Sequence, residues 1–214
     1  HPIGNPMLNY SVYLSNILLP AMLQLIVLMT IVYVIGIELK KSSSLKWLRV
    51  SGYSLLRGLF GKLLPYTVIF TCIGFFYEVY MFKYMHFPLN SSILWMLLNV
   101  FLLVIATESI AVFMIGLFPV LRDGLCFAGL YGILAFSYSG LVYPIEGMPI
   151  ALQTINYGFP LRFFFKIYQN VALNGIDAAY SVTDYLSYIF FLLLPLVVWK
   201  RLKNALVYLN YPKK

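Results

Sequence analysis

Glu108 is the residue of this sequence best placed to do chemistry inside an apolar environment. It lies near the centre of an apolar stretch over about 92–118 that also contains Asn99 and Thr107. An acidic side chain in such a stretch is costly unless it is neutral or partnered. Two interpretations stay open: Glu108 faces a polar cavity, where it contacts a substrate or relays protons, or it bonds a neighbouring helix as a neutral acid, with Asn99 or Thr107 nearby.

Two further acids lie near the ends of apolar stretches. Glu78 lies toward the end of the stretch over about 63–85, and we expect it to pair with Lys83 or to meet lipid headgroups. Glu38 closes the first apolar stretch, over about 13–37, and we expect it to pair with Lys41 or with another part of the basic segment that follows. Glu78, Asn99 and Glu108 are thus candidates for a polar pathway or for helix packing.

No arrangement of residues in the sequence indicates catalysis. Gly61-Lys62 is followed by Leu63 without the glycine spacing of a phosphate-binding loop, and no G-x-S-x-G, HExxH or CxxC motif occurs. The histidines, His1 and His86, and the two cysteines lack the spacing of a metal site. We therefore expect a protein that is not itself an enzyme and that binds no metal or cofactor.

The composition indicates an integral membrane protein. Of the 214 residues, 62% are hydrophobic and 10% are charged, whereas a soluble domain carries about 25% charged residues. The formal charge of +8 does not indicate nucleic-acid binding, because the basic residues flank apolar stretches instead of forming one patch with interleaved aromatic residues.

The hydropathy pattern predicts an all-α, polytopic transmembrane helix bundle that forms one domain. Apolar stretches of about the length of a membrane-spanning helix, roughly 20 residues, predict about five spans: 13–37, 63–85, 92–118, 125–143 and 185–199. A connector, 38–62, joins the first two spans, and a longer segment, 144–184, precedes the last. Because the connector and the C-terminal tail are basic, the positive-inside rule places the C-terminus in the cytoplasm and the N-terminus outside.

The connector predicts an amphipathic helix on the cytoplasmic membrane surface. Ser42, Ser43 and Ser44 offer N-cap oxygens, and the leucines from Leu45 to Leu63 recur at spacings of three and four. Gly52 weakens this helix. Basic side chains opposite the leucines suit either anionic lipid or a cytoplasmic partner.

The segment 144–184 predicts short helices on the outer side. Pro160 is typical of a first helical residue and Asn174-Gly175 of a helix stop. A helix of about 14 residues is too short to span, so it lies at the interface or re-enters the membrane partway.

Three stretches resemble the membrane subunit of a type-2 ABC transporter, an ATP-binding-cassette exporter permease. The first runs from Glu38 to Pro65, the second is SGLVYPIEGMPIALQ (139–153), and the third is YGFPLRFFFKIYQNVALNG (157–175). Phe159-Pro160 stands where Asn-Pro is commoner, and the connector is less acidic than in many members. The resemblance implies that an upstream first span and an extracytoplasmic domain precede this chain, which begins at His1.

The resemblance also implies partners and roles. The connector would hold a coupling helix that docks on a separate nucleotide-binding ATPase subunit, which binds ATP and Mg. Two permease subunits, a homo- or heterodimer, would enclose the pathway in the bacterial inner membrane. The implied coupling residues are Glu38, Leu45, Trp47, Leu48, Arg49 and Lys62, and the implied external gate residues are Glu146, Pro160, Leu161 and Arg162.

Other functions stay open from the sequence. A secondary transporter would use Glu108 as a proton relay and need no ATPase. A membrane subunit that transmits force without substrate flux would keep the ATPase partner. A membrane-embedded enzyme acting on lipid is disfavoured by the missing nucleophile and metal motifs.

Overall fold

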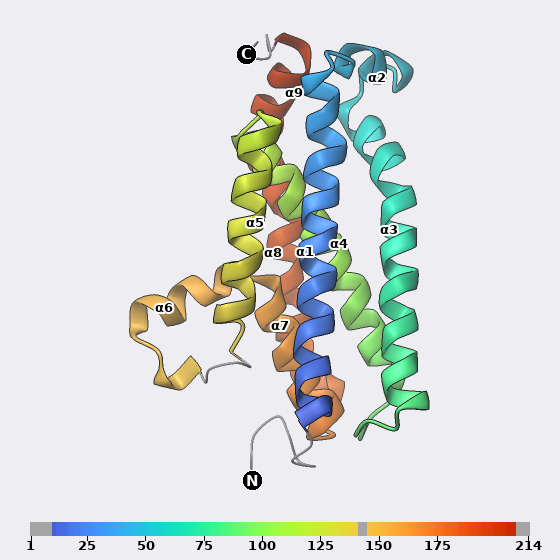
Figure 1. Cartoon of the computed structure of the whole chain (residues 1–214), viewed down its shortest axis with the longest axis vertical. Helices are drawn as coiled ribbons and strands as arrows, with labels where there is room; N and C mark the ends of the chain where they lie inside the picture. Colours follow the sequence, from blue (N-terminus) through green and yellow to red (C-terminus); the bar gives the residue numbers. More distant parts are fainter. Residues whose placement is uncertain (1–9, 141–144, 209–214) are drawn as a thin grey trace.

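The computed structural model shows an all-helical bundle and describes residues 10–140 and 145–208 (Figure 1). No strand occurs in these two ranges. Five long helices run roughly along one axis: α1 (Tyr10–Lys40), α3 (Leu55–Val79), α4 (Ile93–Leu117), α5 (Leu121–Tyr138) and α8 (Val182–Val197). The all-α fold predicted from the hydropathy pattern is confirmed.

Within the described residues, four helical segments are long and apolar enough to cross a membrane: Leu14–Lys40, Leu55–Tyr84, Ile93–Leu117 and Ala178–Val197. They correspond to four of the five predicted spans. The predicted span 125–143 falls on α5, which is 18 residues long and carries Arg122 and Asp123 in its first turn. Residues 141–143 lie outside the described ranges, and this fifth span stays a prediction.

The connector is divided differently from the expected single helix. A short helix, α2 (Ser44–Val50), ends before Gly52 and Tyr53, whose φ angles of +66° and +59° are incompatible with a right-handed helix. Ser54 then caps α3 by accepting a hydrogen bond from the Arg57 backbone N–H. Residues 55–62 therefore form the first turns of a long helix instead of lying along the membrane surface.

The last span begins earlier than 185. A 3-10 turn, η5 (Ala178–Ser181), leads directly into α8, and the Asp177 carboxylate caps it by accepting from the Ala179 N–H at 3.1 Å. These additional residues give the segment 20 residues, enough to span. After Val197 the chain enters a separate basic helix, α9 (Trp199–Tyr208).

Short helices occupy the segment before the last span. They are η2 (Ile145–Gly147), α6 (Ile150–Ile155), η3 (Asn156–Gly158), α7 (Pro160–Ile167) and the π-helix η4 (Tyr168–Leu173). The predicted start at Pro160 and stop at Asn174-Gly175 are confirmed, and Gly175 has a φ of +64°. Another π-helix, η1 (Tyr80–Tyr84), follows directly after α3.

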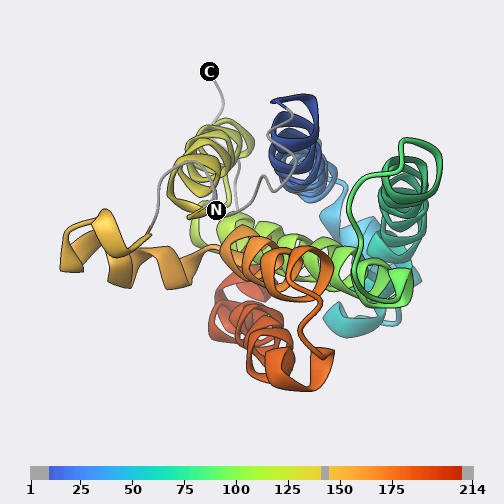
Figure 2. The ribbon, with the colours of Figure 1, turned by 90° about the horizontal axis from the view of Figure 1, so that it is seen from below.

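Helix α4 occupies the centre of the bundle (Figure 2). It packs against α1 and α3 on one side and against α7 and α8 on another. Helices α1 and α5 approach closely at Gly132, where an added Cβ would lie 2.5 Å from Leu25 Cδ1. A small residue such as Gly132 lets two helix backbones approach closely.

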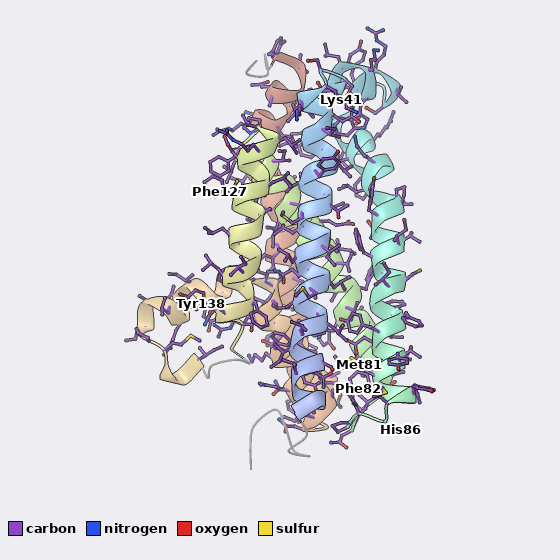
Figure 3. All side chains as sticks on the ribbon, viewed as in Figure 1. Lys41, Met81, Phe82, His86, Phe127 and Tyr138 are labelled. Atoms are coloured by element: carbon purple, nitrogen blue, oxygen red, sulfur yellow. The ribbon has the colours of Figure 1, made fainter. Side chains whose placement is uncertain are left out.

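The bundle has two distinct ends. We call the end that holds α2, the last turn of α1 and α9 the connector end (Figure 1). Lys41 lies at this end and His86 at the opposite end (Figure 3). The basic connector and the basic tail thus lie together, as the charge pattern requires, and their cytoplasmic location stays a prediction.

Candidate functional site

Glu38 joins three segments at the connector end. Its carboxylate pairs with the Lys62 ammonium of α3 and accepts a hydrogen bond from the Ser43 hydroxyl at the entry to α2. The side chains of Lys62 and Glu38 are 16% and 23% exposed, so water screens this pair less than a surface pair. Glu38 therefore finds its partner within the connector, as expected, but in Lys62 instead of Lys41.

Trp47 connects α2 to the start of α3. The Lys62 Nζ lies 4.8 Å from the centre of its ring, a cation–π contact. The ring also packs against Gly58, where an added Cβ would lie 3.4 Å from Trp47 Cε2. One lysine thus bonds the end of α1 and the face of α2 at once.

The inner face of α2 is fixed to the bundle. Leu48 is fully buried in the core, and the buried Ser44 hydroxyl donates to the Leu206 carbonyl of α9 at 2.7 Å. Helix α9 in turn buries Leu202 and Leu206. Leu48 consequently positions α2 and is not available on its surface.

The exposed side chains of α2 and of Tyr53, which follows it, form what we call the docking face: Leu45, Lys46, Arg49, Val50 and Tyr53. Val50 is 91% exposed, Leu45 and Tyr53 are exposed apolar side chains, and Lys46 and Arg49 are exposed cations. A hollow of about 800 Å³ lies beside it, lined by Trp47, Val50 and Lys62 among others. The implied coupling residues include Leu45 and Arg49 but not Val50 and Tyr53. Val50 could have been found from its position opposite Leu48 on a helix, whereas Tyr53 follows the stop at Gly52 and no helical spacing indicates it.

Glu108 lies on α4 and faces α3. Its Oε2 is 2.7 Å from the Thr67 hydroxyl, and its Oε1 is buried without a hydrogen-bond partner. The residue also lines a cavity of about 540 Å³. Glu108 therefore contacts a neighbouring helix and also lines a cavity, but this cavity is mostly apolar and not the polar one considered from the sequence, and the role of Glu108 stays open. Thr107, in contrast, donates to the Leu103 carbonyl of its own helix.

Glu78 does not lie at the surface as expected. It is buried, close enough to Tyr77 and Tyr168 to interact electrostatically, whereas Lys83 is exposed. No ion pair found within the described ranges joins Glu78 to Lys83. The expected pairing is wrong because Glu78 faces the interior of the bundle, toward η4.

Asn99 contacts two other helices in the half of the bundle away from the connector end. It is fully buried, donates to the Phe164 carbonyl of α7 at 3.1 Å and accepts from the Tyr188 hydroxyl of α8 at 2.9 Å. One amide thus joins α4, α7 and α8. This contact identifies Asn99 as a helix-packing residue in this conformation.

The expected gate residues lie on or near α7. Pro160 and Leu161 are buried between the surrounding helices. Arg162 stacks on Tyr157 at 3.8 Å and donates to the Gln153 carbonyl at 3.3 Å. Glu146 belongs to η2, and its side chain lies outside the described part of the structure.

Two further contacts hold this region. Lys166 pairs with the buried Asp184 at 2.8 Å, and Asn90 of the loop before α4 donates to the Ala172 and Leu173 carbonyls. Helix α7 is therefore inserted into the bundle and held from several sides. In residues 10–140 and 145–208, no group of three or more His, Cys, Asp or Glu is arranged to hold a metal.

The comparisons with known proteins agree with this architecture. A family model described as ABC-2 family transporter protein matches residues 1–199. Neither the comparison with curated proteins nor the comparison with solved structures found a match. The match covers nearly the whole chain, so the chain belongs to the ABC-2 transporter family. It is a multi-pass membrane permease component of an ABC transporter, a class that works with an ATP-binding subunit.

Proposed function

We propose that this chain is the permease subunit of an ATP-driven exporter of the bacterial inner membrane. A separate subunit binds ATP and Mg, and α2 receives its movement. The observation that carries the proposal is the arrangement of α2, because its inner face is fixed to the bundle and its outer face exposes apolar and basic side chains. A partner that presents acidic and apolar groups would complement such a face.

The contacts of α2 support a role as a lever. Glu38 links its entry to α1, Lys62 and Trp47 link it to α3, and Ser44 links it to α9. A displacement of α2 would therefore move three helices together. Coupling between distant sites is carried by packed side chains and polar contacts that can adopt two discrete arrangements.

The opposite end would hold the external gate. Helix α7 fills the bundle there with buried aromatic side chains, and Asn99 ties it to α4 and α8. Opening would require exchange of these buried contacts. The proposed gate residues are Glu146, Pro160, Leu161 and Arg162.

A second permease subunit would complete the pathway. Helices α3 and α8 each expose a row of large apolar side chains, including Phe60, Leu64 and Phe76 on α3 and Phe190 and Leu193 on α8. Lipid covers such faces in a monomer, and a second subunit would cover part of them in a dimer.

The docking face provides the test of coupling. In nanodiscs with the ATP-binding subunit, Leu45→Asp and Val50→Asp should lower permease-stimulated ATP hydrolysis by fivefold or more, because each places a charge in the apolar part of the interface. Tyr180→Asp, at an exposed position of the opposite end, is the control. Equal hydrolysis in all three variants would refute coupling through α2. Leu48→Asp is unsuitable, since Leu48 is buried and its change would disrupt folding.

A further inference from the structure

A second potential binding site lies away from the docking face and from α7. The cavity of about 540 Å³ next to Glu108 is formed by α3, α4, α8 and the first residue of α9. Helices α3 and α8 both pack on α4 (Figure 2), and all three contribute side chains to the cavity lining. Its lining is apolar apart from three side chains, those of Thr67, Glu108 and Ser109, in addition to the indole N–H of Trp199.

The cavity has a buried floor and an exposed rim. Leu59, Glu108 and Val112 form the floor and are almost fully buried. The rim consists of large apolar side chains that are half or more exposed: Leu56, Phe60, Leu64, Val68 and Leu196. Both rim helices are among the candidate membrane spans, so in a bilayer the cavity would open sideways to the hydrocarbon.

One polar atom in the floor has no partner. Glu108 is 4% exposed, and its Oε1 makes no hydrogen bond within the described structure. Burying such an acceptor without a partner costs about 1–3 kcal/mol. The surrounding side chains cover this unsatisfied acceptor, and a ligand in the cavity reaches it when the Glu108 carboxyl group turns toward the cavity.

The hydrogen bonds around Thr67 indicate the form of Glu108 that faces the cavity. The Thr67 Oγ1 lies 2.7 Å from Glu108 Oε2 and 3.1 Å from the Leu63 carbonyl oxygen. A threonine hydroxyl has one proton to donate. Both contacts are satisfied when neutral Glu108 donates to Thr67 and Thr67 donates to Leu63, and Oε1 is then a carbonyl acceptor.

The depth of Glu108 restricts the ligand. Glu108 precedes Leu117, the last residue of α4 at the connector end, by nine positions, which is about 13 Å along a helix. Half of the hydrocarbon core of a bilayer is about 15 Å thick. With Leu117 at the membrane surface, Glu108 would lie near the middle of the bilayer, where an uncharged donor on the alkyl chain costs less to bury than a charged headgroup.

We propose that this cavity binds a bilayer amphiphile whose alkyl chain lies against the apolar rim and whose uncharged hydroxyl or amide N–H donates to Glu108 Oε1. The proposal depends on the cavity and on membrane insertion, and it holds whether or not the chain is part of an exporter. It assigns Glu108 to recognition of a lipid-like ligand in place of proton relay.

Trp199 makes the site measurable, because it lines the cavity and bromine quenches indole fluorescence on contact. The full chain in nanodiscs would be titrated with undecanol brominated at its far end and with the methyl ether of the same compound, which lacks the donor. The alcohol should bind about tenfold more tightly, the effect of one hydrogen bond to a buried acceptor. Unbrominated dodecanol should compete, and Trp199→Phe should remove the quenched component.

Variants at Glu108 show whether the site recognises the hydrogen-bond donor of the ligand, only its apolar chain, or a positive charge. Glu108→Leu should abolish the advantage of the alcohol over the ether, and Glu108→Gln, which keeps a carbonyl acceptor and a donor for Thr67, should restore it. Equal binding of alcohol and ether to the unaltered chain would overturn the proposal. The proposal would also be overturned if the unaltered chain bound a brominated alkylamine more tightly than the alcohol and Glu108→Gln lost this preference. The site would then recognise charge.

A second copy of the chain is the competing occupant. A dimer stabilised by a disulfide through Phe60→Cys tests this alternative. If the second copy covers the cavity, the brominated alcohol and its ether quench Trp199 in the monomer but not in this dimer. That result would also overturn the proposal. Ser109→Phe, which fills the cavity, should weaken alcohol binding at least tenfold. Ile133→Phe, at an exposed apolar position of α5, is its control.

Discussion

The ion pair of Glu38 and Lys62 is the contact that most directly fixes α2 to the spans. Both groups are largely shielded from water, and Lys62 contacts the Trp47 ring as well. Breaking a shielded pair by removing one partner leaves the other charge poorly compensated. Removing Lys62 is therefore more costly than removing an exposed lysine or arginine of the same segment.

Lys62→Met tests this contact. We expect a loss of about 1–2 kcal/mol in the free energy of unfolding, measured by chemical denaturation in mild detergent. Arg57→Met is the matched control, because Arg57 lies on the same helix and is exposed. Equal losses in the two variants would show that the pair contributes nothing beyond a surface charge.

Asn99 is a second residue whose role follows from its partners. Asn99→Leu removes the side-chain donor to the Phe164 carbonyl, which keeps the Tyr168 backbone N–H, and leaves the Tyr188 hydroxyl without a partner. This variant should cost about 2–4 kcal/mol, whereas Tyr188→Phe should cost about 1 kcal/mol. Thermal unfolding in nanodiscs measures both. A larger effect of Tyr188→Phe would contradict the position of Asn99 as the centre of this network.

Residue-level predictions from sequence succeeded where a residue type has a single use. Pro160 begins a helix and Gly175 ends one because of their backbone restrictions. The partner of Glu78 was predicted wrongly, because the sequence does not show that Glu78 is buried inside the bundle, where it interacts electrostatically with Tyr168 of η4. Lys62 as the partner of Glu38 depends on the turn at Gly52, which brings α3 back toward α1.

Helix α9 braces α2 from the side. Gly116 of α4 allows the junction of α8 and α9 to approach closely, since an added Cβ would lie 2.6 Å from Val198 Cγ2 and 3.6 Å from Leu202 Cβ of α9. Leu206 accepts the Ser44 hydrogen bond through its backbone and buries its side chain. The basic tail is thus a structural support of the connector as well as a topological signal.

Leu206→Asp should detach α9 and expose the connector. We expect trypsin to cleave after Lys46 or Arg49 at least fivefold faster in this variant, because local opening of α2 becomes easier when its buried contacts are lost. Asn204→Asp, an exposed position of the same helix, is the control. Unchanged cleavage in Leu206→Asp would show that α9 does not hold α2.

The contact of α1 with α5 is equally specific. Gly132→Val should destabilise the bundle by about 1–3 kcal/mol through overpacking against Leu25. Gly129→Val should cost less, because the nearest atom to an added Cβ there is Met29 Sδ at 4.0 Å. Thermal unfolding of the two variants compares them directly, and the reverse order would place the close contact elsewhere.

Element bounds were predictable where hydropathy changes sharply and not where a helix continues past that change. Helices α1 and α4 lie close to the predicted spans because both ends coincide with polar residues. Helix α3 extends to Leu55 and the last span to Ala178, since the Ser54 and Asp177 caps lie outside the apolar stretches. Local capping, which hydropathy does not report, decided these starts.

At the scale of the whole molecule, the charge pattern predicted that the connector and the tail share one end, and the bundle places α2 and α9 together (Figure 1). The family was also evident from three short stretches. The lateral cavity was not predictable, because it depends on how α3, α4 and α8 leave space between them. Membership in the family implies that the chain works with an ATP-binding subunit. The place where that subunit contacts this chain is what needs testing.

Photo-cross-linking from the docking face tests the central claim most directly. A photoreactive amino acid at position 50, where Val50 is 91% exposed, would be activated in native membranes that contain the whole transporter. We expect a covalent product with the ATP-binding subunit, absent when the same group replaces Ile133 of α5. Efficient labelling of lipid alone from position 50, with the ATP-binding subunit present and active, would contradict the account of α2 as the coupling helix.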